Sequence, residues 1–240
     1  MIVLALETAT RSGSAALWID GALRAAAAGD PARTHASRLP NDVLALLEGQ
    51  GLHLDEVDLL SVCLGPGGFT GLRVGIATMQ GLAFATGIPI AGVSALDALA
   101  LAAARNLSSG TVGVWMDAAR KEVFAGRYVP ATAPLGVTAV SAAVSGAPEA
   151  VLAQWDAAGP AATHWTGDGT TLYRDLIAAR DPNAMFLPTP MLAPLVAEAA
   201  IRLGGIATAG SPHALQPVYV RRPDAEIARD VRAAEARAGC

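Results

Sequence analysis

A glycine-rich segment between a buried strand and a helix is the part of this sequence best suited to binding chemistry. Residues 65–77 read GPGGFTGLRVGIA and follow the apolar run 59–64. Glycine permits positive φ and a close approach by a ligand. A helix N-terminus offers unpaired N–H groups and a partial positive charge. A strand that ends in such a turn before a helix therefore predicts a cradle for phosphate or another anion.

The same glycines have a second interpretation, which is close packing of the helix against a neighbour. The P-loop of nucleotide-hydrolysing enzymes is excluded, because Leu72 follows Gly71 where that motif requires Lys and then Ser or Thr. The dinucleotide-binding fingerprint is excluded by the glycine spacing and by the lack of an acidic residue at the required place. Small residues four apart share a helix face, as in Gly71 with Gly75, and Ala77 with Gly81 and Ala85.

Other reactive side chains do not form a recognised catalytic set. Ser12, Ser14, Thr70 and Ser94 occupy positions typical of turns and helix caps. The carboxylates of Glu7, Asp117 and Glu122 could meet across a cleft, although Asp117 is more simply interpreted as a hairpin-turn residue. The four histidines, at 35, 53, 164 and 213, include no pair four residues apart, and His35 is interpreted as a surface or helix-start residue.

The composition predicts a folded chain that does not itself bind nucleic acid tightly. Of its 240 residues 52% are hydrophobic and 16% charged, which excludes the disordered class. The net charge is −4 and no block of Lys or Arg exists, whereas nucleic-acid binding relies on many basic contacts. The two cysteines, Cys63 and Cys240, make no disulfide framework or metal spacing. No signal peptide or membrane span is predicted, so we expect a cytoplasmic protein.

The elements that must position these residues follow from hydrophobic period and turn signals. The first half predicts three strands, then helix, strand, helix, strand and helix. Asp20-Gly21 indicates a two-residue hairpin turn, Gly87 a helix end, and Ser94 with Asp97 a helix start that resembles a capping box. The predicted ranges are strands 2–6, 14–19 and 22–28, helix 36–50, strand 59–64, helix 70–86, strand 88–93 and a helix to about 105. This order predicts an α/β fold with a mixed sheet flanked by helices.

The second half partly repeats that plan after a polar boundary at 106–110. We expect a hairpin of strands 111–116 and 122–129, a loose stretch 130–146, a helix 148–155, a strand 164–166, a turn 167–169, and helices 172–179 and 194–203. The predicted domains are 1–105, an N-terminal lobe with partner-binding helices, 106–222, a smaller C-terminal lobe, and 223–240, a charged tail. From Arg221 onward the pattern fits either a helix or a frayed end.

Several motifs, taken in order, resemble the TsaB (YeaZ) family. They are LALETAT at 4–10 with SAAL at 14–17, the 65–77 segment, Ile88-Pro89 before Val93-Ser94, Asp117-Ala118 with EVF at 122–124, and PVYVR at 217–221. The resemblance covers residues 1 to about 222, and the 65–77 block is its most specific part. It implies an actin-like fold of the sugar-kinase and heat-shock-protein superfamily, with two ribonuclease-H-like lobes.

The resemblance also implies a role. Such proteins are non-catalytic subunits of the machinery that transfers a threonylcarbamoyl group to N6 of adenosine 37 in tRNAs reading codons that begin with A. They bind the catalytic subunit TsaD through their first two helices, are joined by the ATPase TsaE, and form homodimers when alone. tRNA is then reached only through the complex, and the chain requires no cofactor. The catalytic relative holds metal through two histidines four apart on a helix, and this chain lacks such a pair.

On this basis we predict a partner interface at Leu39, Val43, Leu46, Gly71, Gly75 and Met79. Replacing Gly75 with Leu is then expected to lower association while the isolated lobe stays folded. The loop residues Glu7, Thr8, Ser12 and Gly13 are interpreted as a vestigial nucleotide loop, with weak ATP or ADP binding as the alternative. Related loops usually have Asp where this chain has Glu7, which argues against a nucleotide-bound metal.

Two enzymatic functions stay open at this point. One is an autonomous ATP-dependent kinase or transferase of the actin-like superfamily, which calorimetry with ATP and magnesium would reveal. The other is a metallopeptidase, which metal analysis of the purified protein would reveal. A third alternative is a homodimeric interaction protein without a transferase partner.

Overall fold

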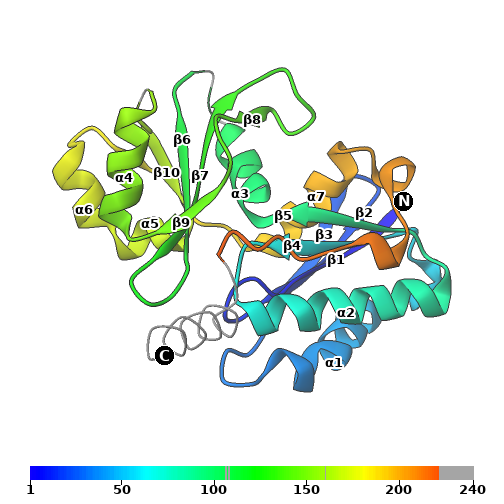
Figure 1. Ribbon diagram of the computed structural model, residues 1–240. Coiled ribbons are helices and arrows are strands. Elements are labelled where there is room, and N and C mark those ends of the chain that lie inside the picture. Colours follow the sequence, from blue (N-terminus) through cyan, green and yellow to red (C-terminus); the bar gives the residue numbers. More distant parts are fainter. Residues whose placement is uncertain (106, 108, 160, 222–240) are drawn as a thin grey trace, which may run out of the picture.

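The protein contains two mixed β-sheets, one in each half of the chain (Figure 1). The computed structural model describes residues 1–240 except 106, 108, 160 and 222–240, so the predicted tail 223–240 lies outside the described residues. The first sheet has the order β3-β2-β1-β4-β5. Its strands are β1 Ile2–Glu7, β2 Ser14–Ile19, β3 Ala22–Ala28, β4 Leu59–Gly65 and β5 Ile90–Ser94. β2 pairs antiparallel with β1 and β3, whereas β1, β4 and β5 are parallel, as a mixed sheet requires.

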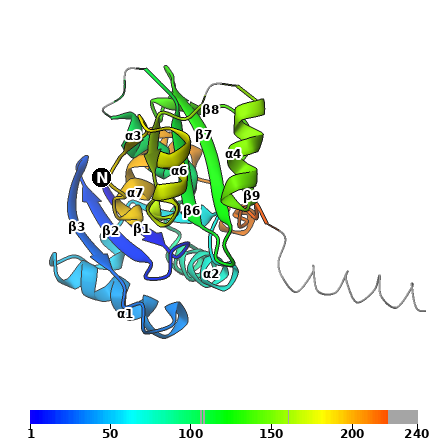
Figure 2. The ribbon, with the colours of Figure 1, turned by 90° about the vertical axis from the view of Figure 1, so that its left-hand side faces the viewer.

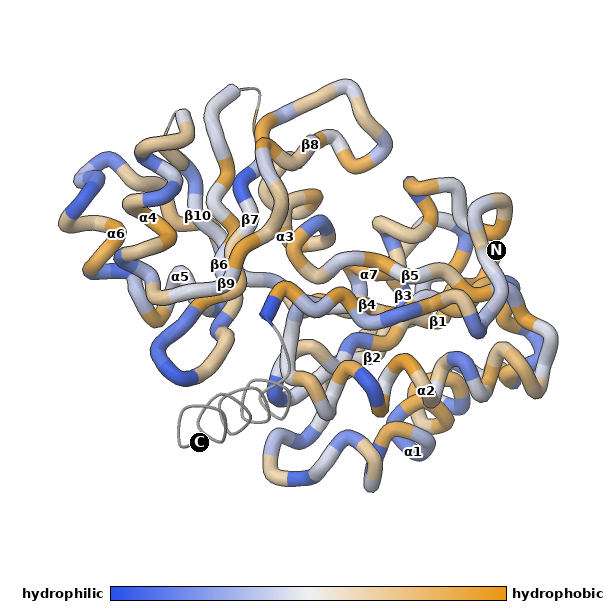
Figure 3. The backbone as a smooth tube through the Cα atoms, in the orientation of Figure 1, coloured by the Kyte–Doolittle hydropathy of each residue, from blue (hydrophilic) through white to orange (hydrophobic). Residues whose placement is uncertain are grey.

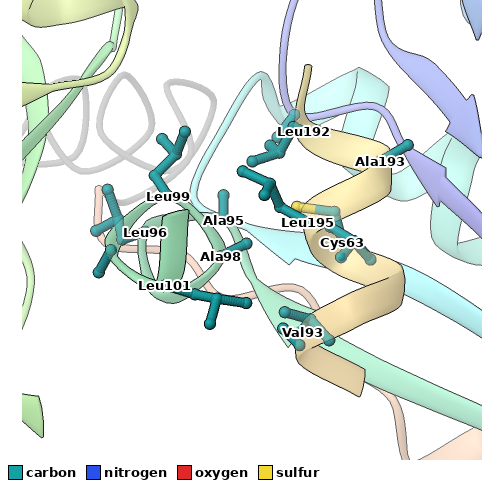
Figure 4. Packing of buried hydrophobic residues seen from close by; sticks show 14 of the residues in the cluster. Cys63, Val93, Ala95, Leu96, Ala98, Leu99, Leu101, Leu192, Ala193 and Leu195 are labelled. Atoms are coloured by element: carbon teal, nitrogen blue, oxygen red, sulfur yellow. The ribbon is translucent and has the colours of Figure 1, made fainter. Parts of the chain in front are cut away.

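Helices cover both faces of this sheet because its central strands are apolar on both sides. Leu4 and Leu6 face α1 His35–Glu48 and α2 Phe69–Thr86, whereas Val3 and Ala5 face α3 Ala95–Ala104 and α7 Leu192–Arg202. This alternation follows from the two-residue period of a strand. Figure 2 shows α1 and α2 on one side of the strands and α7 on the other. Figure 4 shows the α3 and α7 side chains around Cys63 and Val93.

The second sheet has the order β11-β10-β6-β7-β8, with β9 also paired to β7. Its strands are β6 Val112–Asp117, β7 Val123–Pro130, β8 Val137–Ala139, β9 Val144–Gly146, β10 His164–Thr166 and β11 Met185–Phe186. Helices α4 Pro148–Ala157, α5 Asp168–Leu172 and α6 Arg174–Arg180 belong to this half. Short 3-10 turns lie at Leu54–Glu56, Gly205–Thr208 and Pro212–Ala214. None of the described helices is both long and apolar enough to cross a membrane.

The turn and cap signals of the first half are confirmed. Asp20 and Gly21 both have positive φ, 51° and 79°, as the hairpin turn between β2 and β3 requires. Gly87 ends α2 in the left-handed region at φ 73°. The Ser94 hydroxyl accepts a hydrogen bond from the Asp97 N–H at 3.3 Å. The Asp97 carboxylate instead accepts a bond from the Tyr128 hydroxyl at 2.7 Å, so the cap is not reciprocal.

Two expectations for the second half were wrong. The stretch 130–146, predicted as loose, contains β8 and β9, each of three residues. Residues 167–169 were predicted as a turn, whereas α5 begins at Asp168, directly after Gly167. The reason is local: Gly167 has φ 104°, and a side chain there would overlap the Trp115 carbonyl of β6. The glycine therefore lets α5 begin directly against the strand. The glycine signal in the sequence does not distinguish such a helix start from a turn.

Candidate functional site

A cavity of about 550 Å³ lies between the two sheets, where the motifs of the sequence come together. Its first wall is the loop after β1, residues 8–11, with His35 and the start of α2. Its second wall comes from residues 116–119 at the end of β6, with Phe124 and Asp168. Tyr219 and Arg221, near the C-terminus, complete the lining. The glycine segment and Asp117 thus line one interlobe cleft, whereas Glu7 and Glu122 are not among the lining residues, so the three carboxylates singled out in the sequence do not meet there.

Glu7 is buried beneath the loop rather than pointing to a ligand. Its carboxylate accepts hydrogen bonds from the Thr10 and Ser14 hydroxyls, each at 3.0 Å, and from the Thr10 N–H. Burial raises the pKa of Glu7 above its usual range, and these hydrogen bonds offset part of that rise. The Ser14 hydroxyl also accepts a bond from the Ala193 N–H at 3.1 Å, so it caps the start of α7. Glu7 therefore acts as the anchor of the loop and of α7.

The pH dependence of stability should reveal this anchor. A carboxyl whose pKa is raised by folding contributes stability that is full below its unfolded-state pKa and is lost as pH rises through the folded-state value. The Glu7→Gln variant cannot ionise at this position. We therefore expect its free energy of unfolding to fall less than that of the unaltered chain between about pH 4 and pH 7. Urea unfolding across that range measures both profiles, and parallel profiles would contradict the assignment.

A buried arginine fixes the other end of the loop. Arg38 of α1 is 2% exposed and bonds to the Asp42 carboxylate and to the Ser12 carbonyl. Its Nη2 atom also lies 2.9 Å from Nδ1 of His35, which is the first residue of α1. Burial and the Arg38 charge lower the pKa of His35. The loop residues Ser12 and Gly13 thus have structural partners in α1 and in Thr10.

Thr8 occupies a notch made by the α2 glycines. A Cβ added to Gly71 would lie 2.5 Å from the Thr8 carbonyl oxygen, and one added to Gly75 would overlap the Thr8 hydroxyl. Gly67 likewise lies against Ala9 of the same loop. The close approach predicted for these glycines therefore exists, but the element that approaches is the β1–β2 loop rather than another helix.

The carboxylates near the cleft have separate partners within the chain. The described residues contain no group of three or more His, Cys, Asp or Glu side chains that could hold a metal ion. One carboxylate oxygen of Asp168 accepts hydrogen bonds from the backbone N–H groups of Asp117 and Gly169. One carboxylate oxygen of Asp117 accepts a hydrogen bond from the Ala119 N–H. Burial raises the pKa of Asp168. Glu122 is paired with Arg221 at 2.8 Å, so the carboxylates are used separately.

The start of α2 presents to the cleft donors of the kind that bind an anion. Helix α2 begins at Phe69 without a side-chain cap at Gly68, and residues 67–69 and 71 line the cavity. Uncapped N–H groups at a helix start are the donors that bind anions. The phosphate cradle stays a prediction.

The six residues predicted for the partner interface face inward in the structure. Leu39, Val43, Leu46 and Met79 are at most 9% exposed and pack in the core under the first sheet. Gly75 is buried and Gly71 half-buried, both against Thr8. The outward surface of the two helices is therefore made of other residues.

The outward face of the helix pair is apolar and small. Phe84 is 75% exposed and Leu44 49% exposed, and Ala77, Gly81 and Ala85 are exposed along α2. No charged residue occurs between positions 74 and 86. We define the docking face as Leu44, Ala45, Ala77, Gly81, Phe84 and Ala85. The four-residue spacing of Ala77, Gly81 and Ala85 was noted in the sequence as a sign of close packing, but these residues were not among the six predicted for the interface.

The fold and cleft define a two-lobed protein of the actin-like class. Component A of (R)-2-hydroxyglutaryl-CoA dehydratase from Acidaminococcus fermentans superposes on 85% of this chain and 97% of its own, with a TM-score of 0.53 and 10% identity, a likeness of fold alone. The family model described as TsaD, tRNA N6-adenosine threonylcarbamoyltransferase, matches residues 30–187.

More similar proteins narrow the class to one family. A Pseudomonas aeruginosa structure described as similar to the peptidase YeaZ covers 92% of this chain and 99% of its own, with a TM-score of 0.71 and 32% identity. The Escherichia coli protein named tRNA threonylcarbamoyladenosine biosynthesis protein TsaB is 38% identical over 128 residues, which are 53% of this chain and 55% of that protein. The chain belongs to the TsaB (YeaZ) family, and the resemblance noted from its motifs is confirmed.

Proposed function

We propose that this chain is a non-catalytic subunit in the biosynthesis of threonylcarbamoyladenosine in tRNA. It binds the catalytic TsaD subunit and supports it in an active arrangement for transfer to N6 of adenosine 37, in tRNAs reading codons that begin with A. The E. coli relative, a tRNA threonylcarbamoyladenosine biosynthesis protein, supports the pathway.

The docking face is the observation that carries this proposal. An exposed phenylalanine and an exposed leucine beside small residues would be costly to leave in water, and they fit a close helix–helix contact. Small residues let two backbones approach, and apolar anchors supply most of the binding free energy. The partner that fits is therefore a protein that presents its own apolar helix surface.

Further parts of the proposal concern the assembly. The ATPase TsaE joins the complex of this chain with TsaD, and tRNA is contacted only through that complex. When alone, the chain forms homodimers through the docking face. The site of action is the cytoplasm. Within the chain we propose lobes 1–105 and 106–222, with α7 returning to the first sheet, where it packs on β1 and β2.

Light scattering tests the central claim. Mixing this chain with its cognate TsaD is expected to give a species whose mass equals a defined complex of both. Persistence of two separate species at micromolar concentration would contradict it. Calorimetry with ATP and magnesium provides the complementary measurement, because tight binding to the isolated chain would favour an autonomous enzyme.

A further inference from the structure

The last described residues of the chain lie along α2. We call residues 212–221 the C-terminal strap, drawn in orange in Figure 1. The Gln80 side-chain amide donates to the carbonyls of Pro212 at 2.6 Å and Leu215 at 3.1 Å. His213 packs edge-on against Phe84, with ring centroids 5.9 Å apart. The strap is therefore attached to the C-terminal half of α2 by both polar and aromatic contacts.

The strap then reaches the N-terminal end of the same helix. The Tyr219 ring stacks on Phe69 with centroids 5.1 Å apart, and its hydroxyl accepts a hydrogen bond from Nε of Arg73 at 2.8 Å. The Val218 N–H donates to the Leu64 carbonyl of β4 at 2.7 Å. Helix positions 69, 73, 80 and 84 form one stripe. The strap thus follows a single flank of α2 and stops at the cleft.

Arg221 connects the strap to the second lobe. Its guanidinium donates to the Ala118 carbonyl at 3.0 Å and to the Glu122 carboxylate at 2.8 Å. Both acceptors belong to the turn between β6 and β7, which is the hydrophilic loop below β9 in Figure 3. Arg221 also lies over the Phe124 ring, 5.8 Å from its centroid. One side chain of the strap therefore holds both ends of this turn.

The turn that Arg221 holds has an unusual backbone. Ala119, Arg120 and Lys121 have φ values of 56°, 55° and 62°, a region that L-residues with side chains rarely adopt. Such conformations persist only where surrounding contacts impose them. The turn lines the cleft opposite the start of α2 through Ala118 and Ala119. Its conformation therefore depends on contacts that include the strap.

We propose that the C-terminal strap is a latch that couples α2 to the opening of the interlobe cleft. With Arg221 bound, the β6–β7 turn is held toward the first lobe. When the strap loosens anywhere along α2, Arg221 withdraws and the turn relaxes away from the cleft. The latch works in the isolated chain, so its test is independent of the docking proposal.

Hydrogen exchange of the full chain tests the latch. The reporters are the Ala118 and Glu122 amides, which bond across the turn at 3.0 and 2.9 Å. Arg221→Ala is expected to speed their exchange roughly tenfold, the effect of losing one charged hydrogen-bonded contact. Gln80→Ala touches only the far end of the strap and is expected to act in the same direction. Arg202→Ala is the matched control, because it removes an ion pair with Glu198 on α7.

The outcomes separate coupling from simple stabilisation. The Leu60 amide, bonded to Pro89 between β4 and β5, reports general unfolding and should exchange at the unaltered rate in every variant. If Arg221→Ala disturbs folding, Glu122→Gln removes the charge pair while the Ala118 bond remains, and the same turn amides should respond. An unchanged turn in the Arg221 and Glu122 variants would overturn the latch. A response to Arg221→Ala but none to Gln80→Ala would overturn the coupling along α2.

Discussion

Replacing Gly75 with alanine is expected to lower the free energy of unfolding of the isolated chain by about 2 kcal/mol, because the added methyl group overpacks a filled site. The same change at Gly81, which lies further along α2, is expected to raise the free energy of unfolding by up to about 1 kcal/mol. Denaturant unfolding of the two variants and the unaltered chain measures the contrast.

The two changes in the free energy of unfolding have opposite signs because different surroundings meet the added methyl group. A Cβ at Gly75 would overlap the Thr8 hydroxyl and lie 2.9 Å from Cγ2 of the same residue, which is 1% exposed and has no room to move. A Cβ at Gly81 would meet no atom within 4 Å. Alanine there gains helix propensity without a clash.

The Gly71→Ala variant is a second test of the packing of Thr8 against the α2 glycines. Its Cβ would lie 2.5 Å from the Thr8 backbone oxygen, which cannot rotate away, so we expect destabilisation at least as large as at Gly75. Equal stability of the Gly75 and Gly81 variants would contradict the packing of the loop in the helix. The Gly75→Leu change suggested by the sequence therefore probes folding, and it does not isolate association.

The first sheet and its helices were predictable because their signals are local. The strands β1 and β4 are mostly apolar, the Asp20-Gly21 pair is a strong hairpin signal, and α1 has a clear apolar period. The short strands β8 and β9 were not predictable, since three residues give no period to read. Their pairing with β7 depends on tertiary contacts instead.

The candidate site was only partly predictable for a related reason. The strongest apolar stripe of α1, with Leu39, Val43 and Leu46, packs on the chain's own sheet. Periodicity reports that a face is buried, and it does not report what buries it. The docking face has a weaker signal, because small side chains contribute little hydrophobicity. Arg221 bonds to Glu122, 99 residues earlier, and no spacing in the sequence indicates such a contact.

Ala77→Arg is expected to weaken binding to cognate TsaD at least a hundredfold, about 3 kcal/mol, while leaving the fold intact. Ala77 is exposed at the middle of α2, four residues before Gly81 on the docking face, so arginine is tolerated there in water. In a close helix contact the guanidinium would lose its hydration without gaining a partner, and it would hold the two backbones apart. Calorimetric titration with TsaD measures the loss.

Ala150→Arg is the matched control, because Ala150 is also an exposed helical alanine but lies on α4 of the second lobe. Both variants add one positive charge and one long side chain, so a general effect of charge would appear in both. Binding that is lost in Ala77→Arg and kept in Ala150→Arg assigns the contact to the docking face. Equal binding by the two, with unchanged thermal midpoints, would remove α2 from the interface and leave the exposure of Phe84 without a function.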